Sequence, residues 1–190
     1  EALHRERLLI AFDRYLPEFP NITSELVYRE PLWVALNQNN PLAQQTEIRL
    51  DDLRNEPLLS FCLAPHAPYT VSDQTFERIL PLAEQLDIPI HLHLHETTTE
   101  IEESLKQYGV RPLERLLRLG LVGPGLIAVH AVHLQAAEIA LLATHGCSVT
   151  HCPASNLKLA SGITPVAELL QAGVNVGIGT DGAASNNRLD

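Results

Sequence analysis

The stretch IPIHLHLHET, residues 88–97, decides the fold and the site of this 190-residue chain. It alternates apolar residues with His91, His93 and His95. Side chains two apart share one face of a strand, so the three imidazoles can point to the same side of a sheet. Imidazole is a common zinc ligand, but same-face neighbours lie roughly 6.5–7 Å apart, so one strand rarely gives three ligands to one ion. The cluster still favours a metal site, and the alternative is that one or two of these histidines are core residues with satisfied ring nitrogens.

Similar apolar runs recur along the chain, and amphipathic runs separate them. Strands with helices between them predict a parallel sheet covered by helices, as in a doubly wound sheet or a barrel. Polar residues at the carboxyl ends of the strands favour a (β/α)8 barrel, where all those ends converge on one face. The predicted strands are 58–64, 88–94, 126–132, 147–152 and 174–180, the helices are 72–86, 97–109, 111–120, 135–146 and 164–173, and the polar residues are His66, His93 to Glu96, His130, His151 and Asp181.

The composition narrows the class of protein. Apolar residues make up 45% of the chain, which predicts a folded core, and the formal net charge of -10 disfavours nucleic acid and anionic membranes as partners. No apolar run approaches the roughly 20 residues that span a bilayer. Three cysteines without a CxxC motif predict buried thiols in a reducing cytoplasm. Because the sequence contains no methionine, we expect a fragment or a processed chain.

Three further residues carry candidate chemistry. Glu96 follows His93 by three residues, so its carboxyl can serve as a proton shuttle beside a metal, or it can be a solvated loop residue. His130 ends the next predicted strand. Asp181 follows the last strand in GTDG and can complete a zinc site or cap a turn. A nucleophilic pair of Cys152 with His151 is disfavoured, because neighbours in a strand point to opposite faces.

Five motifs follow one another along the chain: APHAPYTVSD (64–73), HLHLHET (91–97), AVHAVHL (128–134), HCPASNLKLASGI (151–163) and GTDGAASNN (179–187). Together they resemble the 5'-methylthioadenosine/S-adenosylhomocysteine deaminases of the amidohydrolase superfamily, which also holds triazine hydrolases and guanine deaminases. The resemblance covers residues 59–190, with the motifs in the family's order. It implies the carboxyl-terminal part of a metal-dependent (β/α)8 TIM barrel, incomplete in this chain.

The resemblance also implies roles for individual residues. His93 and Asp181 are expected to bind one Zn²⁺ per full-length subunit, and Asp181 also to take a proton from the zinc-bound water. Glu96 is expected to protonate the purine ring and contact the substrate. His130 is expected to orient the water, and His66 to contact the nucleoside. The implied reaction replaces the 6-amino group of an adenosine-type nucleoside, such as 5'-methylthioadenosine, by oxygen and releases ammonia.

Residues 1–57 depart from this pattern and weakly resemble the effector-binding domain of LysR-type regulators through REPLWVAL, NPLA and IRLDDL. We therefore expect a foreign segment at 1–57 and a partial barrel at 58–190. The family's first-strand HxH pair is absent, so this chain alone is expected to bind zinc poorly, lack activity and self-associate through open sheet edges. The alternatives are a triazine or other nucleobase amidohydrolase, and a non-enzymatic ligand-binding module.

Overall fold

The structure, a computed structural model, describes residues 41–47 and 60–186. Contacts divide the chain into two units, residues 1–53 and 54–190. In the first unit the described residues form the 3-10 helix η1 (Pro41–Gln44). Residues 1–40 and 48–57 of the predicted 1–57 segment lie outside the described residues, so its foreign origin stays a prediction.

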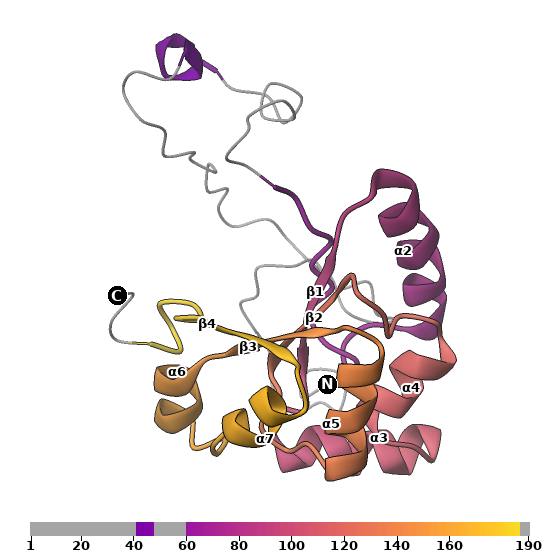
Figure 1. Cartoon of the computed structure of the whole chain (residues 1–190). Coiled ribbons are helices and arrows are strands. Elements are labelled where there is room, and N and C mark those ends of the chain that lie inside the picture. Colours follow the sequence, from indigo (N-terminus) through magenta and orange to yellow (C-terminus); the bar gives the residue numbers. More distant parts are fainter. Residues whose placement is uncertain (1–40, 48–59, 187–190) are drawn as a thin grey trace, which may run out of the picture. The chain divides into compact units, whose positions relative to one another are not determined.

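A four-stranded sheet organises the second unit (Figure 1). Strands β1 (Ile90–Leu94), β2 (Leu126–His130), β3 (Ser148–His151) and β4 (Asn175–Ile178) pair in parallel and in chain order. A doubly wound sheet reverses its order at a switch point, whereas the wall of a barrel does not. The observed order is therefore that of a barrel wall.

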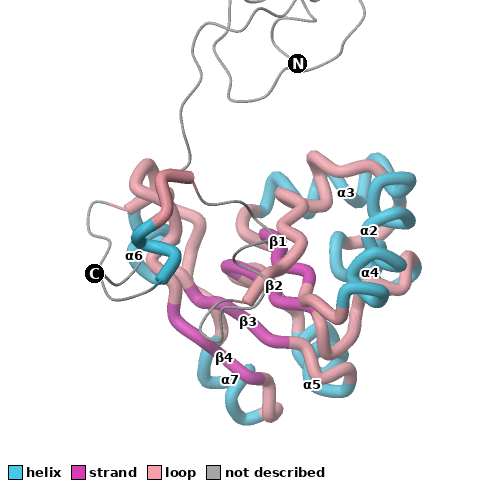
Figure 2. The backbone as a smooth tube through the Cα atoms, turned by 90° about the horizontal axis from the view of Figure 1, so that it is seen from above, coloured by secondary structure: helices cyan, strands magenta, loops and turns pink. Residues whose placement is uncertain are grey.

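Helix α2 (Asp73–Leu86) precedes β1, and helices α3 to α7 lie between successive strands. Figure 2 shows most of these helices along one side of the sheet, with α6 set apart. Ser72 begins α2 as its N-cap by accepting from Thr75 N–H, and Gly109 ends α3 in the left-handed conformation. Among the described helices, none is long and apolar enough to cross a membrane. The helices are α2 (Asp73–Leu86), α3 (Thr98–Tyr108), α4 (Pro112–Arg118), α5 (Ala136–Thr144), α6 (Pro153–Lys158) and α7 (Val166–Gln171).

The core lies between the sheet and these helices. In β1 the apolar Ile90, Leu92 and Leu94 are buried, while His91 and His93 occupy the partly open opposite face. The alternation predicted from the sequence is therefore confirmed over β1. It puts the histidines on the face that lines the inside of a barrel.

Two sequence expectations about the fold are wrong, and one helix was not predicted. In the described part of the predicted strand 58–64 only Leu63 pairs, through one parallel bridge to Ile90, and Phe61 and Cys62 are exposed. This segment is an open edge, so its apolar run does not indicate burial, and only Cys147 and Cys152 are buried thiols. Helix α6 was not expected.

A buried arginine ties α4 to the loop that follows this edge segment. Arg115 Nε donates to Asp73 Oδ1 at 2.7 Å, and its terminal nitrogens donate to the carbonyls of Pro68 and Val71. Its guanidinium also lies 3.9 Å from the ring centroid of Tyr108. Because the planar guanidinium serves all these partners at once, it fixes the loop that carries His66.

We expect Arg115→Met to lower the free energy of unfolding by about 2–4 kcal/mol, because two loop carbonyls lose their donor. Arg118→Met is the matched control. Arg118 pairs with Glu114 on the exposed face of the same helix, so its loss should change stability by no more than about 0.5 kcal/mol. Urea unfolding of both variants measures the difference, and equal effects would contradict the anchoring role.

Candidate active site

The five residues predicted from the sequence meet at the carboxyl ends of the strands. The ring centroids of His66 and His93 lie 4.8 Å apart, and those of His93 and His130 lie 5.3 Å apart. His130 Nε2 is 3.9 Å from both Glu96 Oε2 and Asp181 Oδ2. The predicted convergence is therefore observed, with three imidazoles and two carboxylates in one cluster.

A backbone carbonyl orients the ring of His93. His93 Nδ1 lies 2.6 Å from His66 O, which can only accept, so Nδ1 carries the proton and Nε2 keeps its lone pair. A metal-ligating histidine commonly donates its other ring nitrogen in this way. His93 is therefore arranged as an Nε2 ligand.

His66 is oriented by the same logic. Thr70 donates its hydroxyl hydrogen to Ala67 O, so its oxygen accepts from His66 Nδ1 at 2.9 Å. Partial burial lowers the pKa of His66, and the neighbouring His93 lowers it further, while Glu96 opposes this. A neutral His66 thus presents Nε2 as an acceptor.

Asp181 is held as a carboxylate. Ser155 donates to its Oδ2 at 2.6 Å, and Gly182 N–H donates to its Oδ1 at 2.6 Å. Partial burial alone raises the pKa of Asp181, but these two hydrogen bonds and the nearby His130 and His93 outweigh burial and hold it below its usual range. The side chain can therefore bind a cation.

Left-handed backbone turns place the key side chains. His130 has φ 70° and Asp181 has φ 61°, a region that non-glycine residues rarely adopt and that costs roughly 1–3 kcal/mol per residue. His95, directly after β1, has φ 54°. The surrounding hydrogen bonds must hold these turns, because the sequence offers no glycine at them.

The turn at His95 separates it from His91 and His93. Strict alternation would put His95 on the face of His93, but it is fully buried against α4 and α5. Its Nε2 accepts from Leu113 N–H at 3.1 Å, and its Nδ1 lies 3.6 Å from Glu138 Oε2. Burial lowers the pKa of His95 to about 4. His95 is thus a core histidine, which was the alternative for this cluster, and the prediction that strand alternation places it beside His93 is wrong.

Glu100 anchors the turn that carries Glu96. Its Oε1 accepts from His95 N–H at 3.0 Å, and its Oε2 accepts from Glu96 N–H at 2.9 Å. Its own N–H donates to Thr97, the N-cap of α3. Glu100 was not singled out in the sequence analysis, although its place three residues after a threonine N-cap is a capping-box signal.

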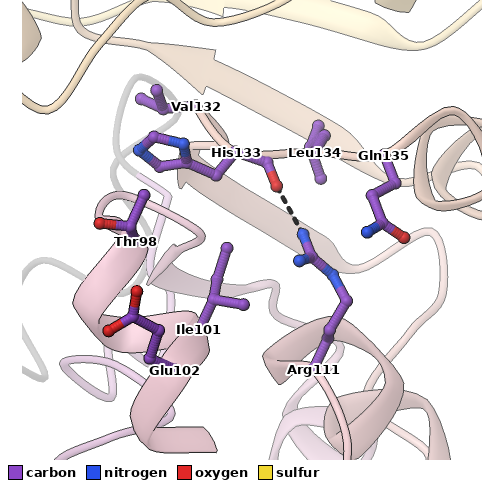
Figure 3. A pocket seen from close by; sticks show the side chains of 8 residues that line it. All are labelled: Thr98, Ile101, Glu102, Arg111, Val132, His133, Leu134 and Gln135. Carbon is purple, nitrogen blue, oxygen red and sulfur yellow. Dashed lines mark hydrogen bonds between the residues drawn. The ribbon is translucent and has the colours of Figure 1, made fainter. Parts of the chain in front are cut away.

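A hollow of about 450 Å³ lies between α3 and the loop that follows β2 (Figure 3). It is lined by residues of α3, by Arg111 and by the segment 132–135, and none of the five clustered residues lines it. Arg111 donates there to His133 O at 2.6 Å and to both carboxylate oxygens of Glu138. Its guanidinium is therefore already occupied, and the chemistry lies with the cluster.

The residues present fit part of a zinc site. His93 Nε2 and the Asp181 carboxylate are the donor types that zinc takes in catalytic sites, and each is oriented by its own hydrogen bonds. Catalytic zinc needs at least three protein ligands, and within residues 41–47 and 60–186 no three His, Cys, Asp or Glu side chains are placed so that together they could hold one metal ion. The described chain thus supplies two ligands.

The chain belongs to the amidohydrolase family, whose sequence profile matches residues 14–190. It is 55% identical over 140 residues to a 5-methylthioadenosine/S-adenosylhomocysteine deaminase of Teredinibacter turnerae, covering 74% of this chain and 32% of that protein. It is 48% identical over 136 residues to the enzyme of that name in Pyrococcus furiosus, covering 72% of this chain and 32% of that protein. The chain thus spans about a third of the length of these relatives.

Solved structures agree. An adenosine deaminase from Xanthomonas campestris with bound zinc matches with a TM-score of 0.72 and 61% identity, over 74% of this chain and 32% of that one. The triazine hydrolase from Arthobacter aurescens matches with a TM-score of 0.65 and 30% identity, over 67% and 28%. The predicted family and the partial amidohydrolase barrel are therefore confirmed.

Glu100 should make stability depend on pH. Burial raises its pKa to about 7, whereas an unfolded glutamate titrates near about 4.3. The folded state thus holds the proton of Glu100 more tightly than the unfolded state does. The stability that this proton contributes is complete at low pH and is lost as the pH rises toward 7. The free energy of unfolding of the wild type minus that of Glu100→Gln should fall by up to about 3 kcal/mol between pH 4.5 and 7.

Urea unfolding across this pH range measures the difference. Glu102→Gln, an exposed change on the same helix, is the matched control for losing a carboxylate. A difference that rises with pH would mean that the two backbone N–H donors outweigh burial.

Proposed function

We propose that this chain provides the acid–base half of a zinc-dependent deaminase that hydrolyses the 6-amino group of an adenosine-type nucleoside, such as 5'-methylthioadenosine. The observation that carries the proposal is the position of His130 Nε2, 3.9 Å from both Glu96 and Asp181. The relatives at about 50% identity that carry deaminase names support the substrate class, whereas the triazine hydrolase is only 30% identical.

Each clustered residue has a task in this reaction. Asp181, whose lowered pKa keeps it ionised at neutral pH, takes a proton from the attacking water. Glu96 delivers a proton to the purine ring nitrogen as the new C–O bond forms at C6. The C–N bond then breaks as Asp181 returns its proton to the amino group, which leaves as ammonia. The proton of the new C6 hydroxyl passes back to Glu96 as the carbonyl forms. His130 accepts a hydrogen bond from the water, and His66 contacts the nucleoside.

Zinc, when bound by His93, Asp181 and further ligands, would lower the pKa of a coordinated water toward about 7. The carbonyl of His66 accepts the hydrogen bond from His93 Nδ1 and so leaves His93 Nε2 free to bind the metal. The relative positions of the two ligands follow from the parallel sheet, because His93 lies on β1 and Asp181 follows β4.

A chimera tests the proposed function directly. The 140-residue segment that aligns with the Teredinibacter turnerae relative replaces its counterpart in that protein, which supplies the rest of the enzyme. We expect zinc-dependent release of ammonia from 5'-methylthioadenosine. A folded, zinc-loaded chimera that hydrolyses a triazine but no adenosine-type nucleoside would overturn the proposal.

In this chimera Glu96→Gln should lower kcat by about 10²–10⁴-fold, because the amide keeps the shape but has no transferable proton. Zinc content, measured by metal analysis, should stay unchanged. Glu103→Gln, on the exposed face of α3, is the matched control and should keep full turnover. Turnover of the Glu96 variant within about threefold of the parent would contradict the proton shuttle.

The 190-residue chain by itself should bind zinc weakly, with a dissociation constant above about 1 µM, because the described part of the chain supplies two protein ligands, fewer than catalytic zinc requires. Isothermal titration measures this, and Asp181→Asn should weaken binding further. Submicromolar one-to-one binding together with steady deamination would show that the chain supplies ligands beyond His93 and Asp181.

A further inference from the structure

Buried polar side chains support the ring of His130 on the side away from the cluster. His130 Nδ1 lies 2.8 Å from Asn156 Oδ1, and Asn156 Nδ2 lies 3.3 Å from Thr164 Oγ1. Thr164 Oγ1 in turn lies 2.6 Å from the backbone oxygen of His130 itself. All three side chains are at most 2% exposed, so the hydrogen bonds form a closed ring away from water.

The direction of each hydrogen bond in this ring follows from one group. The carbonyl of His130 can only accept, so the single hydroxyl hydrogen of Thr164 points to it. The hydroxyl oxygen must then accept, which places the NH₂ group of Asn156 toward Thr164. The amide oxygen is left facing the imidazole, and it too can only accept.

We propose that Asn156 and Thr164 are positioning residues that fix His130 in its Nδ1–H tautomer. The opposite tautomer would set a bare ring nitrogen against a bare amide oxygen in a buried site, which costs about 1–3 kcal/mol. The Nδ1–H form is not the form that histidine prefers in water, so the ring of hydrogen bonds selects it.

The tautomer decides what His130 can do at the site. Its Nε2 carries the lone pair and faces the carboxylates of Glu96 and Asp181, both at 3.9 Å, beyond direct hydrogen-bond length. A donor seated between these groups, such as a water molecule, can therefore give a hydrogen bond to Nε2. This consequence rests on the proposed function, whereas the tautomer stands without it.

Nitrogen NMR of the chain labelled with ¹⁵N-histidine reads the tautomer without substrate or metal. The spectrum is taken at pH 8.5, about two units above the ordinary pKa of histidine, and His130→Gln identifies the signal. We expect the proton on Nδ1 of His130. A wild-type signal with the proton on Nε2 overturns the proposal, whatever the variants do.

A matched pair of variants tests the relay. Thr164→Ser keeps the hydroxyl and should keep the Nδ1–H form. Thr164→Val keeps the shape but frees the amide of Asn156 to rotate, so the Nε2–H form should become populated. His93 is an internal control, because its Nδ1 donates to a backbone carbonyl in every variant. A valine variant with the wild-type tautomer would remove Thr164 from the proposal.

Kinetics of the chimera separate positioning from a merely structural role. Thr164→Val should lower kcat by about 10–100-fold, a usual effect of losing a partner behind a site histidine, and leave KM within about twofold. Thr164→Ser should restore kcat. An inactive parent chimera with an Nδ1–H His130 would overturn the proposed function but support the tautomer, and an unchanged kcat in the valine variant would overturn the catalytic consequence.

Discussion

The parallel pairing of four strands in chain order is the constraint on which the site depends. Leu94 pairs with His130, and His151 pairs with Ile178, so successive strands end at the same edge of the sheet. His93 lies in β1 and Glu96 just after it, His130 ends β2, and Asp181 follows β4. This edge therefore brings together side chains that are far apart in the sequence. Left-handed turns at His130 and Asp181 complete the arrangement. Their strain is tolerable because Thr164, Ser155 and Gly182 hold the turns.

The second organising feature is the placement of protons on the imidazoles. The Nδ1 atoms of His66, His93 and His130 each face an oxygen that must accept a hydrogen bond. These oxygens belong to a hydroxyl, a backbone carbonyl and a side-chain amide, respectively. The Nε2 atoms are thereby left with lone pairs. A metal ion and a water molecule both need such lone pairs, so the cluster is prepared for both before either binds.

The main elements could be predicted from the sequence because the apolar residues that form the core also follow the spacing of the element. This spacing is an apolar run in β1 and β2 and a helical repeat in α2. The sequence also predicted the five clustered residues, because polar residues at strand ends are unusual among apolar runs. It failed where tertiary geometry decides. The left-handed turn at His95 breaks the alternation and buries that imidazole, and the apolar segment before His66 lies exposed at an edge. Pro153 at the first turn of α6 was an available helix signal, whereas the roles of Asn156 and Thr164 depend on long-range contacts.

Anomalous diffraction at the zinc edge, from crystals of the chimera, tests the central claim most directly. The account predicts one zinc at about 2.0–2.2 Å from both His93 Nε2 and a carboxylate oxygen of Asp181, with His130 Nε2 beside it. A zinc bound through His91 or His95, or through Nδ1 of His93, would contradict the account. It would mean that the hydrogen bonds in this structure do not determine which ring nitrogen is free to bind the metal.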